Sequence, residues 1–81
     1  MARVLFSGVL RQHVGGASEL EFEVDSYREL LRALDQRFPG FAELVEGRMT
    51  LALDGELISD PMFERLEVDS EVHFVPRIGG G

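Results

Sequence analysis

The chain has 81 residues, of which 44% are hydrophobic and 28% charged, and it contains no cysteine. This length suits one compact domain, and the composition is that of a globular protein and not of a disordered one. Fifteen acidic residues against eight basic ones give a formal net charge of −7, which repels phosphate backbones and anionic membranes. We therefore expect no nucleic-acid or membrane partner, no disulfide bond and no thiolate chemistry.

The first quarter of the chain is predicted to form a hairpin. Residues 3–10 are rich in valine, leucine and phenylalanine, which is typical of a strand. Residues 15–18 contain two glycines and indicate a turn. Residues 19–24 then alternate glutamate with apolar residues, which predicts a second strand with one buried face.

A helix is predicted over residues 26–38. Ser26 and Glu29 have the spacing of a capping box, in which each side chain bonds a free backbone N–H at the helix start. Proline and glycine at 39–40 end the helix, and residues 41–46 suggest a short second helical turn. The apolar stripe of the main helix comprises Tyr27, Leu30, Leu31, Leu34 and Phe38.

The remaining residues are predicted to add three strands. Residues 50–53 form one strand, and Asp54-Gly55 is a strong signal for a tight turn to a short partner strand at 56–58. Residues 62–66 suggest a turn of helix. Residues 71–76 form the last strand, with Val72 and Phe74 on one face and His73 and Val75 on the other.

This order of elements predicts an α+β fold of the ubiquitin-like β-grasp type, with a mixed four- to five-stranded sheet and one main helix packed across it. We expect a single β-grasp domain over residues 1–78 and a flexible glycine tail over residues 79–81. The chain has no apolar run long enough to cross a membrane and no cleavage site after its first residues. We therefore expect a cytoplasmic protein.

Most other chemical signals in the sequence are weak. His13 and His73 are far apart, no cysteine accompanies them, and no carboxylates cluster at ligand spacing, so no metal site is expected. No nucleophile elbow is present, and Gly15-Gly16 is not followed by the residues of a phosphate loop. The chain by itself is therefore not expected to be an enzyme.

The informative segment is the C-terminal one. A strand of apolar residues ends at Pro76, and the chain closes with three glycines, 79–81. Because glycine has no Cβ, such a tail can lie extended in a narrow channel and present the α-carboxylate of Gly81 without hindrance. That carboxylate could attack the α-phosphate of ATP inside a partner enzyme. A frayed end or an expression remnant is the alternative interpretation of the glycines alone.

The chain resembles a known family at this point. A β-grasp domain of this length that opens with Val4-Leu5-Phe6, contains Leu10-Arg11 and ends EVHFVPRIGGG over residues 71–81 is similar to the MoaD/ThiS sulfur carriers. Within them it is most similar to MoaD, the small subunit of molybdopterin synthase. The resemblance covers the whole chain. It implies that an E1-like enzyme adenylates the terminal glycine, which becomes a thiocarboxylate and donates sulfur in molybdopterin-type or related biosynthesis.

The resemblance also implies site residues and partners. Gly81 would carry the sulfur, and the tail residues that would contact partner enzymes are Pro76, Arg77, Ile78, Gly79 and Gly80. Candidates for docking on the outer face of the sheet are Leu5, Ala52 and Val75, for each of which a place in the core is equally open. The implied partners are the E1-like adenylating enzyme and a sulfur-accepting synthase subunit or biosynthetic enzyme. The chain would bind no cofactor, since ATP is used by the activating partner.

Two residues depart from the MoaD pattern. Arg77 stands where many MoaD-type tails carry a second proline, and Ser7 stands at an outward position that is often aromatic. Both positions lie where the large subunit of a synthase would contact the tail or the first strand. The departures therefore bear on molybdopterin synthesis and not on sulfur carriage.

Two other functions are compatible with the sequence. In a ubiquitin-like protein modifier, a lysine amine of a substrate attacks the same acyl adenylate. The chain contains no lysine, so it could not accept its own conjugation on a side chain. The second alternative is a non-catalytic structural β-grasp module, in which the three glycines begin a linker.

Overall fold

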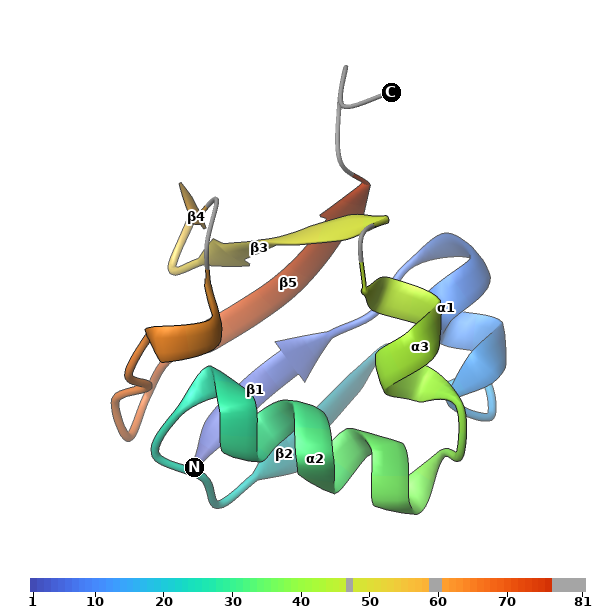
Figure 1. Ribbon diagram of the computed structural model, residues 1–81, viewed down its shortest axis with the longest axis horizontal. Coiled ribbons are helices and arrows are strands. Elements are labelled where there is room, and N and C mark those ends of the chain that lie inside the picture. The colour runs from blue at the N-terminus through green and yellow to red at the C-terminus, as the bar shows by residue number, and fades with distance from the viewer. Residues whose placement is uncertain (47, 59–60, 77–81) are drawn as a thin grey trace.

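The computed structural model describes residues 1–46, 48–58 and 61–76. Within these residues, five strands form one mixed sheet in the order β2-β1-β5-β3-β4, and the helices lie on one side of it (Figure 1). The strands are β1 (Ala2–Leu5), β2 (Glu19–Phe22), β3 (Met49–Leu53), β4 (Glu56–Ile58) and β5 (Glu71–Pro76). The helices are α1 (Gly8–His13), α2 (Tyr27–Arg37), α3 (Phe41–Val45) and the 3-10 turn η1 (Pro61–Phe63).

The sheet confirms the predicted fold class. The first and last strands, β1 and β5, pair in parallel at its centre, whereas the β1–β2, β3–β5 and β3–β4 pairs are antiparallel. With α2 packed across one face, this is the α+β arrangement of the ubiquitin-like β-grasp fold. The bounds of β5 are those predicted from the sequence.

The prediction of a strand over residues 3–10 was wrong beyond Leu5. The strand β1 ends there, and the chain forms the short helix α1 before it returns in β2. Gly8 begins α1 with a φ of +59°, a conformation that glycine adopts without a steric penalty and that turns the chain out of the strand. Leu10 and Val14, four residues apart, are both buried, as helical geometry allows.

The start of α2 carries the predicted cap, with one difference. The N–H of Glu29 donates to Ser26 Oγ at 3.2 Å, as a capping box requires. The carboxylate of Glu29 accepts from the N–H of Asp25 at 3.2 Å, one residue earlier than in the standard box. The first bond satisfies a backbone donor that the helix leaves free, and the second ties the residue before the cap to the first turn.

The turn between β3 and β4 matches its prediction and also fixes the start of β5. Asp54 and Gly55 have φ values of 50° and 86°, and two successive positive values are typical of a type I′ hairpin turn. Asp54 Oδ1 accepts from the N–H of Glu71 at 2.8 Å, and the N–H of Asp54 donates to the carbonyl of Glu71 at 2.9 Å. The hairpin and the last strand are therefore held together at this end.

The core lies between the sheet and the helices. Phe74 of β5 packs edge-on against Phe41 of α3 at 5.4 Å between ring centroids, and Phe6 packs edge-on against Phe41 at 6.0 Å. Leu30 and Leu34 of α2 are fully buried over the same face of the sheet. The residues that complete the buried core are Ala2, Val4, Leu10, Val14, Tyr27, Val45, Leu51, Leu66 and Val72.

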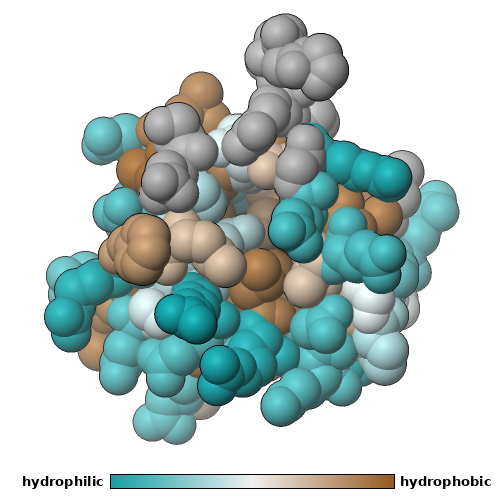
Figure 2. All heavy atoms as spheres, in the orientation of Figure 1, coloured by the Kyte–Doolittle hydropathy of each residue, from teal (hydrophilic) through white to brown (hydrophobic). Residues whose placement is uncertain are grey.

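The surface on the helix side is mainly hydrophilic, and apolar atoms face the solvent over η1 and in several smaller places (Figure 2). Phe63 of η1 is 86% exposed. In the described part of the chain, every helix is too short or too polar to span a membrane.

Candidate functional site

The candidate site begins with β5, which runs through the middle of the sheet and leads to the glycine tail. Its side chains alternate as predicted. Val72 and Phe74 are buried against the helices, whereas His73 and Val75 are half-buried on the opposite, outer face. The outer face is not covered by the helices of the described residues, which lie on the other side of the sheet (Figure 1).

Register pairing brings the predicted docking residues together on this outer face. His73 is opposite Leu5 in the β1–β5 pair and opposite Ala52 in the β3–β5 pair. Val75 follows two residues along β5, on the same side of the sheet. Leu5, Ala52 and Val75 are each half-buried, so none of them belongs to the fully buried core.

One exposed residue extends this row and was missed by the sequence reasoning. Leu57 of β4 is the register partner of Ala52, and its side chain is 66% exposed. A strand of three residues is too short for alternation to show which residue faces outward. We call Leu5, Ala52, Leu57, His73 and Val75 the outer patch.

The charge of the outer face changes from one side of the sheet to the other. Glu19 and Glu21 of β2 are exposed beside Leu5 and Arg3, which are their register partners. Arg3 Nη2 forms an ion pair with Glu71 Oε2 at 3.0 Å, with both side chains nearly half exposed. The outer patch is therefore flanked by carboxylates on the β2 side and ends with the apolar side chain of Leu57 on the β4 side.

The predicted tail begins where β5 ends. Pro76 is the last residue of β5 and pairs with Met49 of β3, at the end of the sheet away from the N-terminus (Figure 1). The structure therefore fixes the backbone from which the tail starts. The other predicted tail residues, Arg77, Ile78, Gly79, Gly80 and Gly81, lie outside the described residues.

The described residues were also compared with the needs of a metal site. Among them, no group of three histidine, aspartate or glutamate side chains is close enough to hold a metal ion. His13 lies on α1 and His73 on β5, which are separate elements. Burial raises the pKa of the Tyr27 hydroxyl to about 12, which keeps the side chain neutral as a member of the core.

Comparison with known proteins identifies the family of the chain. The model of a family described as the ThiS family matches residues 4–81, from Val4 in β1 through the three glycines. No protein of curated function matches the chain significantly.

Solved structures show the same fold at low sequence identity. A chain of the Amycolatopsis orientalis BexX/CysO complex is 18% identical with a TM-score of 0.83, and all of both chains is covered. Mycobacterium tuberculosis CysO is 16% identical with a TM-score of 0.84, and 96% of this chain and 100% of that one are covered. The small archaeal modifier protein 1 of Methanosarcina acetivorans is 19% identical with a TM-score of 0.82, and 99% of this chain and 95% of that one are covered.

Proposed function

Because the chain belongs to the ThiS family of small ubiquitin-like sulfur carriers, we propose that it carries sulfur as a thiocarboxylate on Gly81. One observation carries this proposal, namely that the family match extends from Val4 through the glycines at 79–81. The reactive group would be the α-carboxylate of Gly81 in the mature protein. The chain then acts as a carrier and co-substrate, and the catalysts are its partners.

The proposed chemistry has two steps, both carried out in the active site of an E1-like enzyme. A carboxylate oxygen of Gly81 attacks the α-phosphorus of ATP, pyrophosphate leaves, and an acyl adenylate forms. A sulfide sulfur then attacks the carbonyl carbon, AMP leaves with the oxygen that had joined it to the glycine, and a thiocarboxylate remains. No electron is gained or lost in either step, and ATP is bound by the partner.

The fold supports this chemistry by fixing the end of the strand from which the tail starts. Pro76 is held in the sheet beside Met49, so the tail starts from a fixed point. In the proposal, Arg77 and Ile78 line the opening of the partner's channel, and Gly79 and Gly80 pass through it. Glycines fit there because a channel that excludes water has little room for a Cβ atom.

The outer patch is the surface that we propose docks the partner enzymes. Half-buried apolar side chains on a sheet face that lacks a helical cover are suited to a protein interface. The carboxylates on the β2 side favour a partner whose contact surface is basic on that side, chiefly through faster association. The sulfur acceptor would be a synthase subunit or another biosynthetic enzyme, with molybdopterin-type synthesis as the specific case that Ser7 and Arg77 disfavour.

A second candidate function is protein modification. Two structures whose fold matches at TM-scores of 0.82 and 0.72 are of small archaeal modifier protein 1, from Methanosarcina acetivorans and Haloferax volcanii. In this case a substrate lysine attacks the acyl adenylate and forms an isopeptide bond to Gly81. The two functions share the adenylate and differ in the nucleophile.

Intact-mass spectrometry tests the proposal. The protein, ending at Gly81, is incubated with ATP, sulfide and the E1-like enzyme from its own genome. We expect the mass to rise by the difference between one sulfur and one oxygen atom. An unchanged mass, with an enzyme that activates another carrier, would overturn the proposal. A remnant of this chain's C-terminus, Ile-Gly-Gly-Gly after cleavage behind Arg77, on substrate lysines in cells would instead assign the chain as a modifier.

A further inference from the structure

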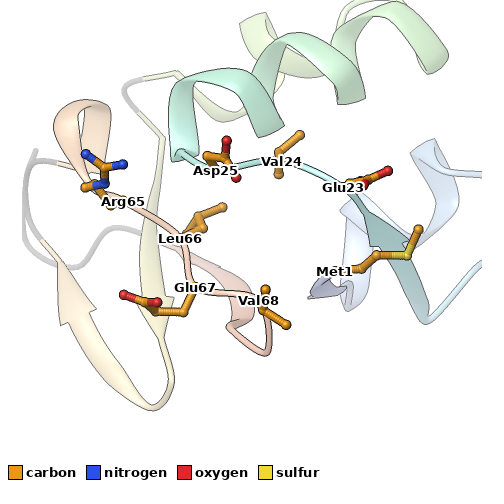
Figure 3. A pocket seen from close by; sticks show the side chains of 8 residues that line it. All are labelled: Met1, Glu23, Val24, Asp25, Arg65, Leu66, Glu67 and Val68. Carbon is orange, nitrogen blue, oxygen red and sulfur yellow. The ribbon is translucent and has the colours of Figure 1, made fainter.

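A second surface lies at the end of the sheet where β1 and β5 begin. A cavity of about 470 Å³ opens between the β2–α2 connection and the segment that leads from η1 to β5 (Figure 3). The residues around it are Met1, Glu23, Val24, Asp25, Arg65, Leu66, Glu67 and Val68.

Backbone hydrogen bonds hold the walls of this cavity. The N–H of Leu66 donates to the carbonyl of Asp25 at 2.9 Å, and the N–H of Tyr27 donates to the carbonyl of Glu64 at 3.0 Å. The two segments are thus joined where α2 begins and part from each other toward Val24 and Val68 (Figure 3). A cavity with fixed walls loses little conformational entropy when a ligand fills it.

The lining of the cavity combines apolar side chains with acidic ones. Val24 is half-buried, whereas Val68 is 72% and Met1 56% exposed, so the lining offers apolar surface to a ligand. Met62 and Phe63, which are 43% and 86% exposed, come shortly before this segment and add apolar surface.

The charges around the cavity are mainly negative. Glu23, Asp25 and Glu67 supply three carboxylates against two positive groups, the guanidinium of Arg65 and the α-ammonium of Met1. Within the part of the chain that the structure describes, the only ion pair joins Arg3 to Glu71, so Arg65 forms no ion pair with any of the three carboxylates. The cavity therefore favours a ligand that brings positive charge.

This cavity is remote from the surfaces that the proposed function uses. Because β1 and β5 are parallel, Met1 and Val68 lie at the end of the sheet where both strands begin, and Pro76 lies at the other end. A partner that holds the tail and the outer patch would leave the cavity open. It can thus be occupied at the same time by a second protein.

We propose that this cavity binds a basic, apolar segment of a second partner protein, with an aliphatic side chain seated between Val24 and Val68 and an arginine or lysine beside Glu23 and Glu67. A second copy of this chain does not suit the cavity. It would bring carboxylates against carboxylates on a protein of net charge −7. The inference goes beyond the sulfur-carrier function and does not depend on it.

The test is a titration of the isotope-labelled protein, followed by NMR, with a blocked peptide of alternating arginine and leucine. A peptide of alternating glutamate and leucine is the matched probe of opposite charge. We expect the basic peptide to cause saturable amide shifts in residues 23–25 and 65–68 and the acidic peptide to cause none there. Higher salt weakens the binding, since exposed charges are screened.

Three variants on exposed positions make the test specific. Val68→Asp and Glu67→Arg should each weaken binding about tenfold, which corresponds to about 1.4 kcal/mol. Glu43→Arg on α3 changes the net charge as Glu67→Arg does but lies outside the cavity, and should leave binding within about twofold. Equal weakening by both charge changes, shifts spread over the whole acidic surface, or unchanged binding by Val68→Asp would overturn the proposal.

Sedimentation of the protein alone tests whether a second copy of the chain occupies the cavity. We expect a monomer over the concentrations used for NMR. A dimer that Val68→Asp dissociates would assign the cavity to a second copy of the chain and contradict the basic partner. Because no activating enzyme or ATP is present in either experiment, neither result depends on sulfur transfer.

Discussion

His73 of β5 and Leu5 of β1 are register partners across the parallel pair at the centre of the sheet, on the face that the helices leave open. Both side chains are half-buried there. An imidazole thus lies beside an aliphatic side chain in the middle of the outer patch. A substitution at either position changes this surface without entering the core between sheet and helices.

The outer patch is expected to govern activation by the E1-like enzyme. Leu5→Arg or Ala52→Arg should lower the rate of adenylation at limiting protein about tenfold or more, equivalent to about 1.4 kcal/mol of lost docking energy. Gln36→Arg, on the exposed side of α2, is the matched control and should keep the rate. Pyrophosphate exchange measures the rate, and far-UV circular dichroism checks that each variant is folded. A normal rate for both patch variants contradicts docking through this face.

Tail length is expected to be critical for activation but not for stability. Deletion of Gly81, or addition of one residue after it, moves the carboxylate away from the α-phosphate of ATP and should abolish adenylation. The melting temperature should stay the same, because the described core ends with β5 at Pro76. Pyrophosphate exchange and calorimetry of the same preparations check the two halves of the prediction. Activation of the shortened chain would rule out Gly81 as the reactive residue.

Phe74 is expected to be a main source of stability. Its ring is 2% exposed and packs against Phe41, Phe6 and Tyr27. Phe74→Ala should cost about 3–5 kcal/mol, a large part of the roughly 5–15 kcal/mol available to a domain. Phe74→Leu should cost less, since it refills much of the space. Urea denaturation measures both, and a loss below about 1 kcal/mol for the alanine variant would show that the ring is not the centre of the core.

The cap of α2 makes a smaller, local contribution. Ser26→Ala removes the acceptor for the N–H of Glu29 and should cost about 1 kcal/mol of unfolding free energy. Ser18→Ala, in the exposed turn before β2, is the control and should change stability by less than about 0.5 kcal/mol. Equal effects of the two substitutions in urea denaturation would show that the cap bond adds nothing.

The raised pKa of Tyr27 predicts how the free energy of unfolding changes at alkaline pH. Its pKa is about 12 in the folded protein, against an ordinary value of 10.0, because burial disfavours the phenolate. Between these two values the unfolded chain releases the phenolic proton and the folded chain keeps it. Stability is therefore fully present below about pH 10 and is lost as the pH rises toward 12, by up to about 1.4 kcal/mol per pH unit.

The composition makes this pH range simple to interpret. The chain has one tyrosine, no lysine and no cysteine, and arginine stays charged throughout. Urea midpoints at about pH 9 and about pH 11 should differ in the native protein and nearly coincide in Tyr27→Phe. An equal decline of the urea midpoint in Tyr27→Phe would show that a group other than Tyr27 causes the pH dependence.

Much of the fold could be predicted from the sequence, because the longer elements carry their own signals. The capping box at Ser26 and the apolar stripe define α2, and alternation defines β5 with its outward His73 and Val75. The error over residues 8–10 arose because a short apolar run suits a strand or a helix equally. The spacing of Phe6, Leu10 and Val14, four residues apart, was the signal that favoured a helix.

The candidate site could be predicted in part. Alternation placed Leu5, Ala52 and Val75 on one face, and the two-residue turn at Asp54-Gly55 was a local signal that pairs Ala52 with Leu57. The register of β1 with β5, which brings Leu5 beside His73, is set by distant segments, and local sequence does not decide it. The cavity beside Val68 was also beyond prediction. It is formed by segments about forty residues apart that meet only through tertiary hydrogen bonds such as that from Leu66 to Asp25.

The parallel pairing of β1 with β5 has a consequence for how the protein is made. Arg3 and Glu71 are 68 residues apart in sequence, yet they are neighbours in the sheet. During synthesis β1 has no central partner until the last strand has left the ribosome, and such long-range pairing folds slowly compared with local contacts. A chain cut short before β5 thus lacks both the middle of the sheet and the residues that follow it. The same strand thus completes the sheet and carries the segment on which the proposed function depends.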